Sequence, residues 1–212
     1  IYDVIALKTK IPVRELNSNS REKFEKICSK LKGEIVGQEN AIEAAVNIIK
    51  KIMLGLKDSN KPYSLMFMGP SGVGKTELSK KIGSYLVGSD NIIRLDMSEY
   101  SSSSSISKLV GASPGYVGYE DNKNILEEVR NKPYSVLILD EGVIKDSSGR
   151  NIRFDNVVIL MTSNIGFDDI HIGFNQNKKE AAVSKLKEYF SVPFVNRIDN
   201  VIVFNNLTKD NI

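Results

Sequence analysis

The sequence predicts a three-layer α/β fold, in which a parallel sheet carries helices on both faces. Short apolar runs alternate with stretches of helical periodicity, which is typical of this architecture. Two of the runs are apolar without interruption, as expected for strands buried on both faces of a parallel sheet. A chain of 212 residues can bury roughly 70% of its unfolded surface in one core. The expected strands are 65–68, 91–95, 136–139, 157–161 and 201–204.

Helices are expected before and between these strands. Residues 21–32 place apolar side chains on one face of a charged helix, which we expect Gly33 to end. Residues 41–53 repeat apolar side chains at helical spacing up to Gly55. Further helices are expected at 106–110, 122–130 and 178–190.

The most informative motif is GPSGVGKT at residues 69–76, between an expected strand and an expected helix. That order is what the GxxxxGK[ST] pattern requires, because glycines let backbone N–H groups turn toward phosphates at a helix N-terminus. Lys75 can reach the terminal phosphates and the Thr76 hydroxyl can bind Mg²⁺. A plain Gly/Pro turn is the weaker alternative, so the sequence predicts a nucleotide site. The expected binding residues are Ser71, Gly72, Val73, Gly74, Lys75, Thr76 and Glu77.

Polar residues follow the strand ends, which converge on one crevice in a parallel sheet. Asp140 is suited to holding Mg²⁺ through water, and Glu141 to orienting and deprotonating the attacking water; the alternative is that both merely begin a loop. Asn164 is a candidate to hydrogen-bond that water or the γ-phosphate, although asparagine is more often a turn former. Arg197 is a candidate arginine finger, whose guanidinium would stabilise the transferred phosphoryl group. Spacing alone favours instead a salt bridge from Arg197 to Asp199 or to another nearby carboxylate.

Composition narrows the function classes. The formal net charge is +3, and the basic residues are scattered rather than gathered into a nucleic-acid footprint. With only Cys28 and His171, the sequence predicts neither a disulfide framework nor a histidine and cysteine metal cluster. No apolar run is long enough to span a bilayer. Heavy use of Asn, Lys and Ile indicates an AT-rich coding sequence, which favours a plastid-type or other organelle of an AT-rich eukaryote and leaves the cytoplasm open.

The chain contains, in this order, the segments 36–38, 69–78, 93–100, 111–119, 132–141, 161–164 and 194–199. Together these seven segments resemble the second nucleotide-binding domain of the Clp-type AAA+ unfoldases. The resemblance implies a P-loop AAA+ large subdomain at residues 34–212, with residues 1–33 as a lead-in segment and helix from a preceding region. It also implies ATP or ADP and Mg²⁺ as cofactors, ATP hydrolysis in a homo-hexamer, and a small helical subdomain that is expected after residue 212.

The same resemblance implies roles for individual residues. It supports Lys75, Thr76 and Asp140 on phosphate and Mg²⁺, and makes Glu141 the catalytic base. Asn164 becomes the first sensor, and Arg197 becomes the finger acting on a neighbour's nucleotide. The remaining residues would line the adenine pocket (Ile35 and Val36) or form a pore loop that grips a polypeptide (Tyr116 and Val117).

Three departures from the family stand out. Between Glu141 and Gly142 the family carries a helix and a turn, so on the order of 20 residues are expected to be missing there. A normal peptide between these two residues, with Cα atoms about 3.8 Å apart, would contradict that hypothesis. The segment before the finger reads SVPF at 191–194 rather than RPEF, and Asn122 and Lys123 stand where the family has two glycines.

Several functions remain open from sequence. A ClpC-like unfoldase coupled to a ClpP-type protease is favoured, because Ile172, Gly173 and Phe174 lie where such proteins carry an apolar docking tripeptide. The first alternative is a ClpB-like disaggregase without a protease. More distant alternatives are a nucleic-acid-directed AAA+ loader and a scaffold that binds nucleotide without hydrolysing it. Protein substrates are the expected partners in the favoured reading, without nucleic acid or a membrane span.

Overall fold

We describe the protein from a computed structural model of the 212-residue chain. The structure describes residues 20–53, 61–97, 128–129, 131–132, 134–140, 157–165, 167 and 178–208. The expected helix at 106–110 lies outside these residues, and of the helix expected at 122–130 only Glu128 and Val129 are described, both helical.

Five parallel strands form the sheet in the order β2-β3-β4-β1-β5. Met68 at the end of β1 pairs with Ser163 at the end of β4, and Asp96 at the end of β2 pairs with Asp140 at the end of β3. The carboxyl-terminal ends of the strands therefore lie together, on the side of the sheet where the phosphate loop begins. The strands are β1 (Tyr63–Met68), β2 (Ile92–Asp96), β3 (Val136–Asp140), β4 (Val158–Ser163) and β5 (Asn200–Val203).

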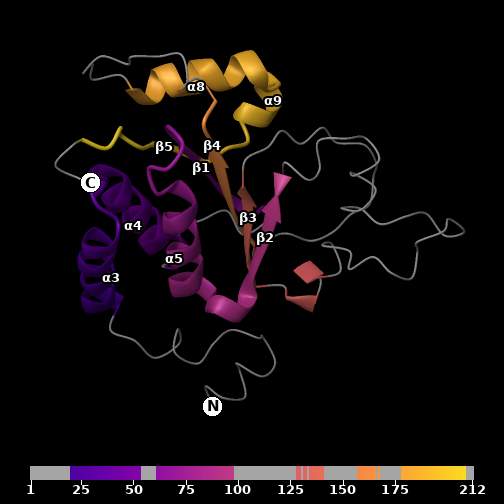
Figure 1. Cartoon of the computed structure of the whole chain (residues 1–212). Helices are drawn as coiled ribbons and strands as arrows, with labels where there is room; N and C mark the ends of the chain where they lie inside the picture. Colours follow the sequence, from indigo (N-terminus) through magenta and orange to yellow (C-terminus); the bar gives the residue numbers. More distant parts are fainter. Residues whose placement is uncertain are drawn as a thin grey trace, which may run out of the picture.

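Helices cover both faces of this sheet, which confirms the predicted three-layer arrangement. Helices α3, α4 and α5 lie together on one side, whereas α8 and α9 lie apart from them (Figure 1). A short 3₁₀ helix, η1 (Ser89–Asn91), leads from α5 into β2. The helix bounds are α3 (Ser20–Glu34), α4 (Glu39–Met53), α5 (Lys75–Val87), α8 (Lys178–Tyr189) and α9 (Val192–Val195).

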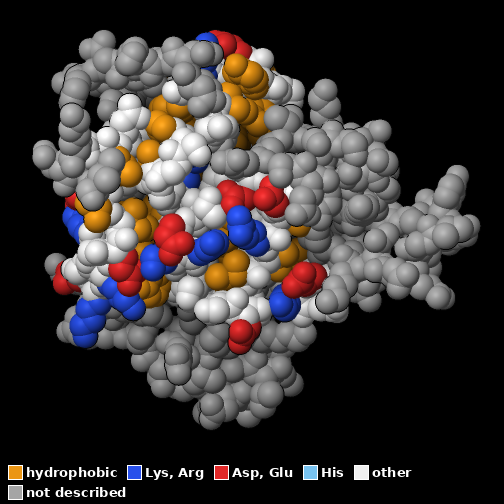
Figure 2. All heavy atoms as spheres, in the orientation of Figure 1, with side chains coloured by type: hydrophobic (Ala, Val, Ile, Leu, Met, Phe, Trp, Pro, Cys, Tyr) orange, Lys and Arg blue, Asp and Glu red, His pale blue; other side chains and the backbone are white. Residues whose placement is uncertain are grey.

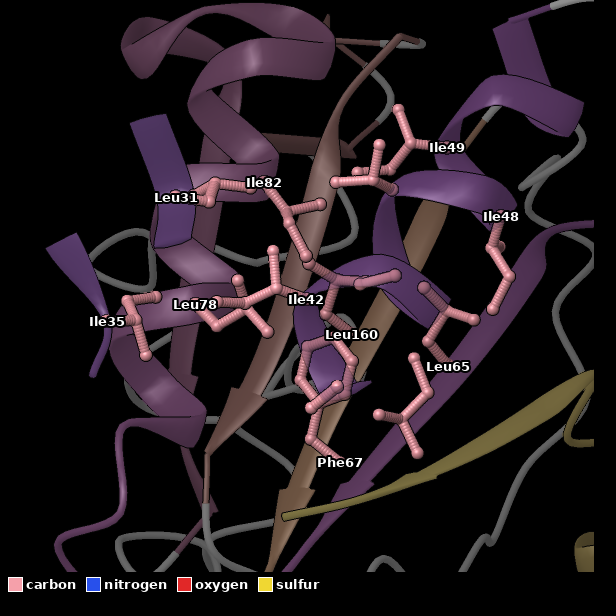
Figure 3. Packing of buried hydrophobic residues seen from close by; sticks show 14 of the residues in the cluster. Leu31, Ile35, Ile42, Ile48, Ile49, Leu65, Phe67, Leu78, Ile82 and Leu160 are labelled. Atoms are coloured by element: carbon pink, nitrogen blue, oxygen red, sulfur yellow. The ribbon is translucent and has the colours of Figure 1, made fainter. Parts of the chain in front are cut away.

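Alternate side chains of the strands supply two separate apolar cores. Leu65 and Phe67 of β1 pack with Leu160 of β4 against helices α3, α4 and α5, as Figure 3 shows. Met66 and Met68, which point to the other face, pack with residues of α8 and α9. Because α3 contributes Phe24, Ile27 and Leu31 to the first core, this helix packs as part of the same body as the sheet.

The element boundaries differ from the expected ones in three places. Gly33 does not end the first helix, which continues to Glu34; nothing lies within 4 Å of where its Cβ would be, so this position sets no packing constraint. Thr162 and Ser163 belong to β4, because both continue its pairing with β1. The short helix α9 was not expected, and Pro193 stands in its first turn, where a proline is well tolerated.

The charged side chains of the described residues are interspersed on the face shown in Figure 2, where blue and red atoms alternate. Among the helices that the structure describes, none combines the length and the apolar character needed to cross a membrane.

Candidate nucleotide-binding site

The phosphate loop joins β1 to the start of α5, as the motif predicts. Gly72 and Gly74 have φ angles of 76° and 98°, in the left-handed region that side chains other than glycine rarely adopt. Gly74 immediately precedes α5, and its carbonyl accepts a hydrogen bond from the backbone of Leu78 at 2.9 Å. The N-terminus of a 13-residue helix is therefore presented at the loop, where the positive end of the helix dipole favours an anion.

Lys75 is the first residue of α5 and is buried, with 5% of its surface exposed. Its ammonium group donates hydrogen bonds to the carbonyl oxygens of Gly69 at 2.8 Å and Pro70 at 2.5 Å. The charge is thus held within the loop rather than extended into solvent. This position is the one from which a lysine can meet phosphate oxygens that enter the loop.

Asp140, at the end of β3, receives three side-chain donors. Its Oδ1 accepts hydrogen bonds from the hydroxyls of Thr76 at 2.7 Å and Thr162 at 2.5 Å. Its Oδ2 forms an ion pair with Arg94 of β2 at 2.7 Å. The carboxylate therefore connects the phosphate loop, β2 and β4 at the edge where the strands end.

These contacts keep Asp140 ionised. Burial by itself raises the pKa of this carboxyl, but hydrogen bonds from Thr162, Thr76 and Arg94, together with the charge of Arg94, bring the pKa below its ordinary value of 3.8. An ionised carboxylate beside a hydroxyl is an oxygen donor set of the kind that Mg²⁺ prefers, completed in such sites by water and phosphate oxygens. Thr76 and Asp140 are the residues that would hold Mg²⁺, which would neutralise charge developing on the phosphates.

The segment expected to contact adenine lies beside the loop. Ile35 is buried and stands 3.2 Å from the position that a Cβ of Gly74 would take, whereas Val36 is 53% exposed. Gln38 is fully buried, and its amide exchanges two hydrogen bonds of 2.9 Å with the backbone of Asn205. The end of β5 therefore fixes the position of the segment that contains Ile35 and Val36.

The two remaining candidates that the structure describes lie at opposite ends of the strands. Asn164 directly follows β4, and its neighbour Ser163 accepts a hydrogen bond from the backbone of Gly69 at 3.2 Å, so Asn164 lies beside the phosphate loop. Arg197 precedes β5 at the opposite end and is exposed. The salt bridge with Asp199 that spacing favours is not formed, because the Asp199 carboxylate binds Lys61 and Ser64 instead.

Sequence reasoning missed Arg94, Thr162 and Gln38. Arg94 is a charged residue inside the apolar 91–95 run, which was a usable signal, although its partner could not be known without the register of β2 and β3. Thr162 lies inside β4, one residue beyond the end expected for that strand. The candidates Glu141, Tyr116, Val117 and Ile172–Phe174 lie outside the described residues.

Comparisons with known proteins agree with this geometry. A family profile described as "AAA domain (Cdc48 subfamily)" matches residues 60–141 and 137–201. The chain is 40% identical to "Chaperone protein ClpB" of Mycoplasma genitalium, covering all of this chain and 32% of the relative. It is 39% identical to "ATP-dependent Clp protease ATP-binding subunit ClpA homolog" of Porphyra purpurea, covering all of this chain and 30% of the relative.

A solved structure, "S. cerevisiae Hsp104:casein complex, Extended Conformation", superposes with a TM-score of 0.82 at 34% identity. The similarity covers all of this chain and 40% of that chain. The present chain thus spans about a third of the length of the curated relatives that it matches. Its fold, its phosphate loop and these matches place it in the AAA domain family of the Cdc48 subfamily, a family of ATPases, and within that family among the Clp-type proteins.

Proposed function

We propose that this chain is the ATP-hydrolysing domain of a hexameric protein unfoldase that threads polypeptides through a central pore. The observation that carries the ATPase part is the hydrogen bond between Thr76 of the phosphate loop and Asp140 of β3. It brings the residue expected to contact Mg²⁺ from the loop together with the residue expected to contact it from the strand. The similarity to ClpB, ClpA and Hsp104 proteins supports a polypeptide as the substrate.

The position of Arg197 supports hydrolysis between subunits. β1 and β5 run parallel, with Leu65 opposite Asn200, so Arg197 lies near the amino-terminal ends of the strands. The phosphate loop begins at Gly69, at the carboxyl-terminal ends. The five residue steps from Ser64 to Gly69 span about 16 Å of strand, which separates the turn that carries Arg197 from the phosphate loop of its own chain. In a ring, the exposed side chain would instead face the nucleotide of a neighbour.

Glu141 directly follows Asp140 and is the proposed general base. A carboxylate at this point would accept a proton from the water that attacks the γ-phosphate. Asn164, at the end of the adjacent strand β4, would orient that water or the γ-phosphate. Arg197 of the neighbouring subunit would stabilise the charge of the transferred phosphoryl group.

Coupling to a ClpP-type protease is the finer proposal, supported by the tripeptide Ile172–Phe174. Relatives named ClpB support a protease-independent disaggregase to the same degree. Binding of the full-length ring to ClpP, measured by gel filtration and lost in Phe174→Ala, would support the protease-coupled form. A ring that binds no ClpP while rescuing aggregated protein would establish the disaggregase.

We also propose that the native protein carries a segment between Glu141 and Gly142 that this chain lacks. The family profile matches in two parts, of which the first ends at residue 141. The match to the Mycoplasma genitalium relative runs over 232 positions, which exceeds the 212 residues of this chain by 20. Mass spectrometry of the native protein would decide, since a peptide that joins Glu141 directly to Gly142 would contradict the proposal.

The experiment for the whole proposal uses the full-length protein and a fluorescent client with an unfolded tail. ATP should cause loss of client fluorescence. Glu141→Gln should retain ATP binding, measured with a fluorescent nucleotide, while losing turnover and unfolding. Tyr116→Ala should continue to hydrolyse ATP while failing to unfold the client. A ring that hydrolyses ATP at a normal rate and leaves the client folded would overturn the unfoldase proposal.

A further inference from the structure

The turn that carries Arg197 is held by its backbone, while the guanidinium makes no ion pair with any residue that the structure describes. The N–H of Arg197 donates to the carbonyl of Phe194 at 3.0 Å, and the next N–H, of Ile198, donates to Val195 at 3.1 Å. The ring of Phe194 stacks on Phe190, which directly follows α8, at a centroid distance of 5.0 Å, so α9 is attached to the end of the longer helix. One side of the turn is thereby fixed.

Ser64 of β1 holds the other side of the turn. Its hydroxyl lies 3.0 Å from the carbonyl oxygen of Arg197 and 3.0 Å from Oδ2 of Asp199. The hydroxyl oxygen of Ser64 also accepts a hydrogen bond from the backbone N–H of Asp199 at 3.1 Å. A single small side chain therefore contacts both ends of the three-residue segment in which Arg197 is the first residue.

Asp199 completes this arrangement by acting as an extension of the sheet. Ladder pairing between β1 and β5 begins at Leu65 and Asn200, one residue further along. Below that pair, the backbone N–H of Ser64 donates to Oδ2 of Asp199 at 2.8 Å, so a carboxylate takes the place of a strand carbonyl. Lys61 contacts the other oxygen, Oδ1, at 3.0 Å.

Burial makes this network difficult to replace with water. Ser64 is 9% exposed and the Asp199 side chain is 15% exposed, whereas the Lys61 side chain is 55% exposed. Buried hydrogen bonds to a charged acceptor are strong, and a buried group that loses its partner is destabilised by the full loss of solvation. The rigid part of the network is therefore the Ser64–Asp199 pair, and Lys61 is an exposed addition to it.

We propose that Ser64 and Asp199 are positioning residues for Arg197, and that they hold its backbone so that the guanidinium reaches the phosphoryl group on the neighbouring subunit. This inference rests on the proposed function, in which Arg197 acts across a subunit interface. It assigns Ser64 and Asp199 a part in turnover although neither residue contacts the nucleotide. Because displacement of a reacting group by about 1 Å can lower a rate about 10²-fold, a small relaxation of this turn has a large kinetic effect.

The test measures ATP turnover and nucleotide binding in the full-length ring. Ser64→Ala should lower kcat by about 10²-fold. The KM for ATP and the affinity for fluorescent ADP should stay within about twofold of the wild-type values, because an interaction made only in the transition state leaves binding unchanged. Ser64→Thr, which retains a hydroxyl, should recover most of the rate. Tyr63→Phe is the matched control, since the Tyr63 hydroxyl accepts a hydrogen bond from the side chain of Asn200 and lies beside the network.

A double variant separates positioning from general destabilisation. Ser64→Ala combined with Arg197→Ala should be no slower than Arg197→Ala alone, because the serine acts only through the arginine. Additive losses, or a loss of ADP affinity in Ser64→Ala, would overturn the positioning role. If the alanine variant does not assemble, Asp199→Asn is measured in the same way. An inactive Arg197→Ala ring beside a fully active Ser64→Ala ring refutes this inference alone, whereas a fully active Arg197→Ala ring refutes the proposed function of the arginine itself.

Discussion

A Cβ atom placed on Gly69 would lie 2.8 Å from the Cβ of Phe204, closer than real Cβ atoms approach other heavy atoms. The backbone cannot easily yield there, because the N–H of Phe204 donates to the carbonyl of Met68 at 2.7 Å. The first glycine of the phosphate loop is therefore required by its packing on the residue that follows β5, in addition to any contact with phosphate.

Gly69→Ala should consequently destabilise the fold by about 1–3 kcal/mol, the range of overpacking in a rigid site, and weaken nucleotide binding. Urea unfolding and titration with a fluorescent ADP would measure the two effects. Gly33→Ala is the matched control, because its Cβ meets nothing within 4 Å in α3 and the lower backbone entropy should stabilise by about 0.5–1 kcal/mol. Equal stability of the two variants would contradict the packing argument.

Gln38→Ala should destabilise the protein and lower its nucleotide affinity together. The substitution removes two hydrogen bonds to the half-buried backbone of Asn205, each of which contributes about 0.5–1.5 kcal/mol. The affinity should fall because the Ile35–Val36 segment loses its attachment to β5. Asn47→Ala, on an exposed position of α4, should change stability by less than about 0.5 kcal/mol. A Gln38→Ala protein with wild-type urea midpoint would show that the two hydrogen bonds contribute nothing net.

The lowered pKa of Asp140 predicts a specific acid dependence of stability. A carboxyl with a depressed pKa in the folded state stabilises the fold above its ordinary value of 3.8, and this contribution is lost as pH falls through the lower folded pKa. Asp140→Asn should therefore be less stable than wild type at neutral pH, with a difference that narrows below pH 3.8. Urea unfolding between neutral and acidic pH, in buffer with chelator and without nucleotide, would measure it. If the stability difference between wild type and Asp140→Asn instead grows toward acidic pH, the pKa of Asp140 is raised rather than lowered in the folded protein.

Arg197→Ala should lower ATP turnover by about 10³-fold or more, as expected for loss of an arginine finger. Lys75→Ala should be inactive for a different reason, namely loss of the phosphate contact on its own chain. When the two inactive variants are mixed and reassembled, turnover should partly return, because each supplies what its neighbour lacks. Mixed rings that remain as inactive as their parents would place Arg197 outside the catalytic interface.

The fold and the centre of the site could be predicted from sequence because their signals are local. The glycine spacing around Lys75 and the apolar run before Asp140 each carry their meaning within a few residues. The partners of Asp140 could not be found this way, because the contact with Arg94 depends on the register of β2 against β3. Of the salt-bridge partners expected for Arg197, Asp199 was wrong for a related reason. Ser64 of β1 and Lys61, which precedes β1, reach its carboxylate from 135 or more residues away in the chain.

Strand β5 contains only four residues, from Asn200 to Val203. In the proposed ring, each of its ends would lie near a different ATP molecule. The N-terminal end of β5 follows Arg197, which would act on the nucleotide of one neighbouring subunit. Beyond its C-terminal end, Phe204 packs on Gly69 and Asn205 binds Gln38, both beside the nucleotide site of its own subunit. Because β5 is extended and paired with β1 along its length, we expect a displacement at one end of the strand to be transmitted to the other end. The strand β5, about 13 Å long, would then couple ATP hydrolysis in one subunit of the ring to hydrolysis in the next.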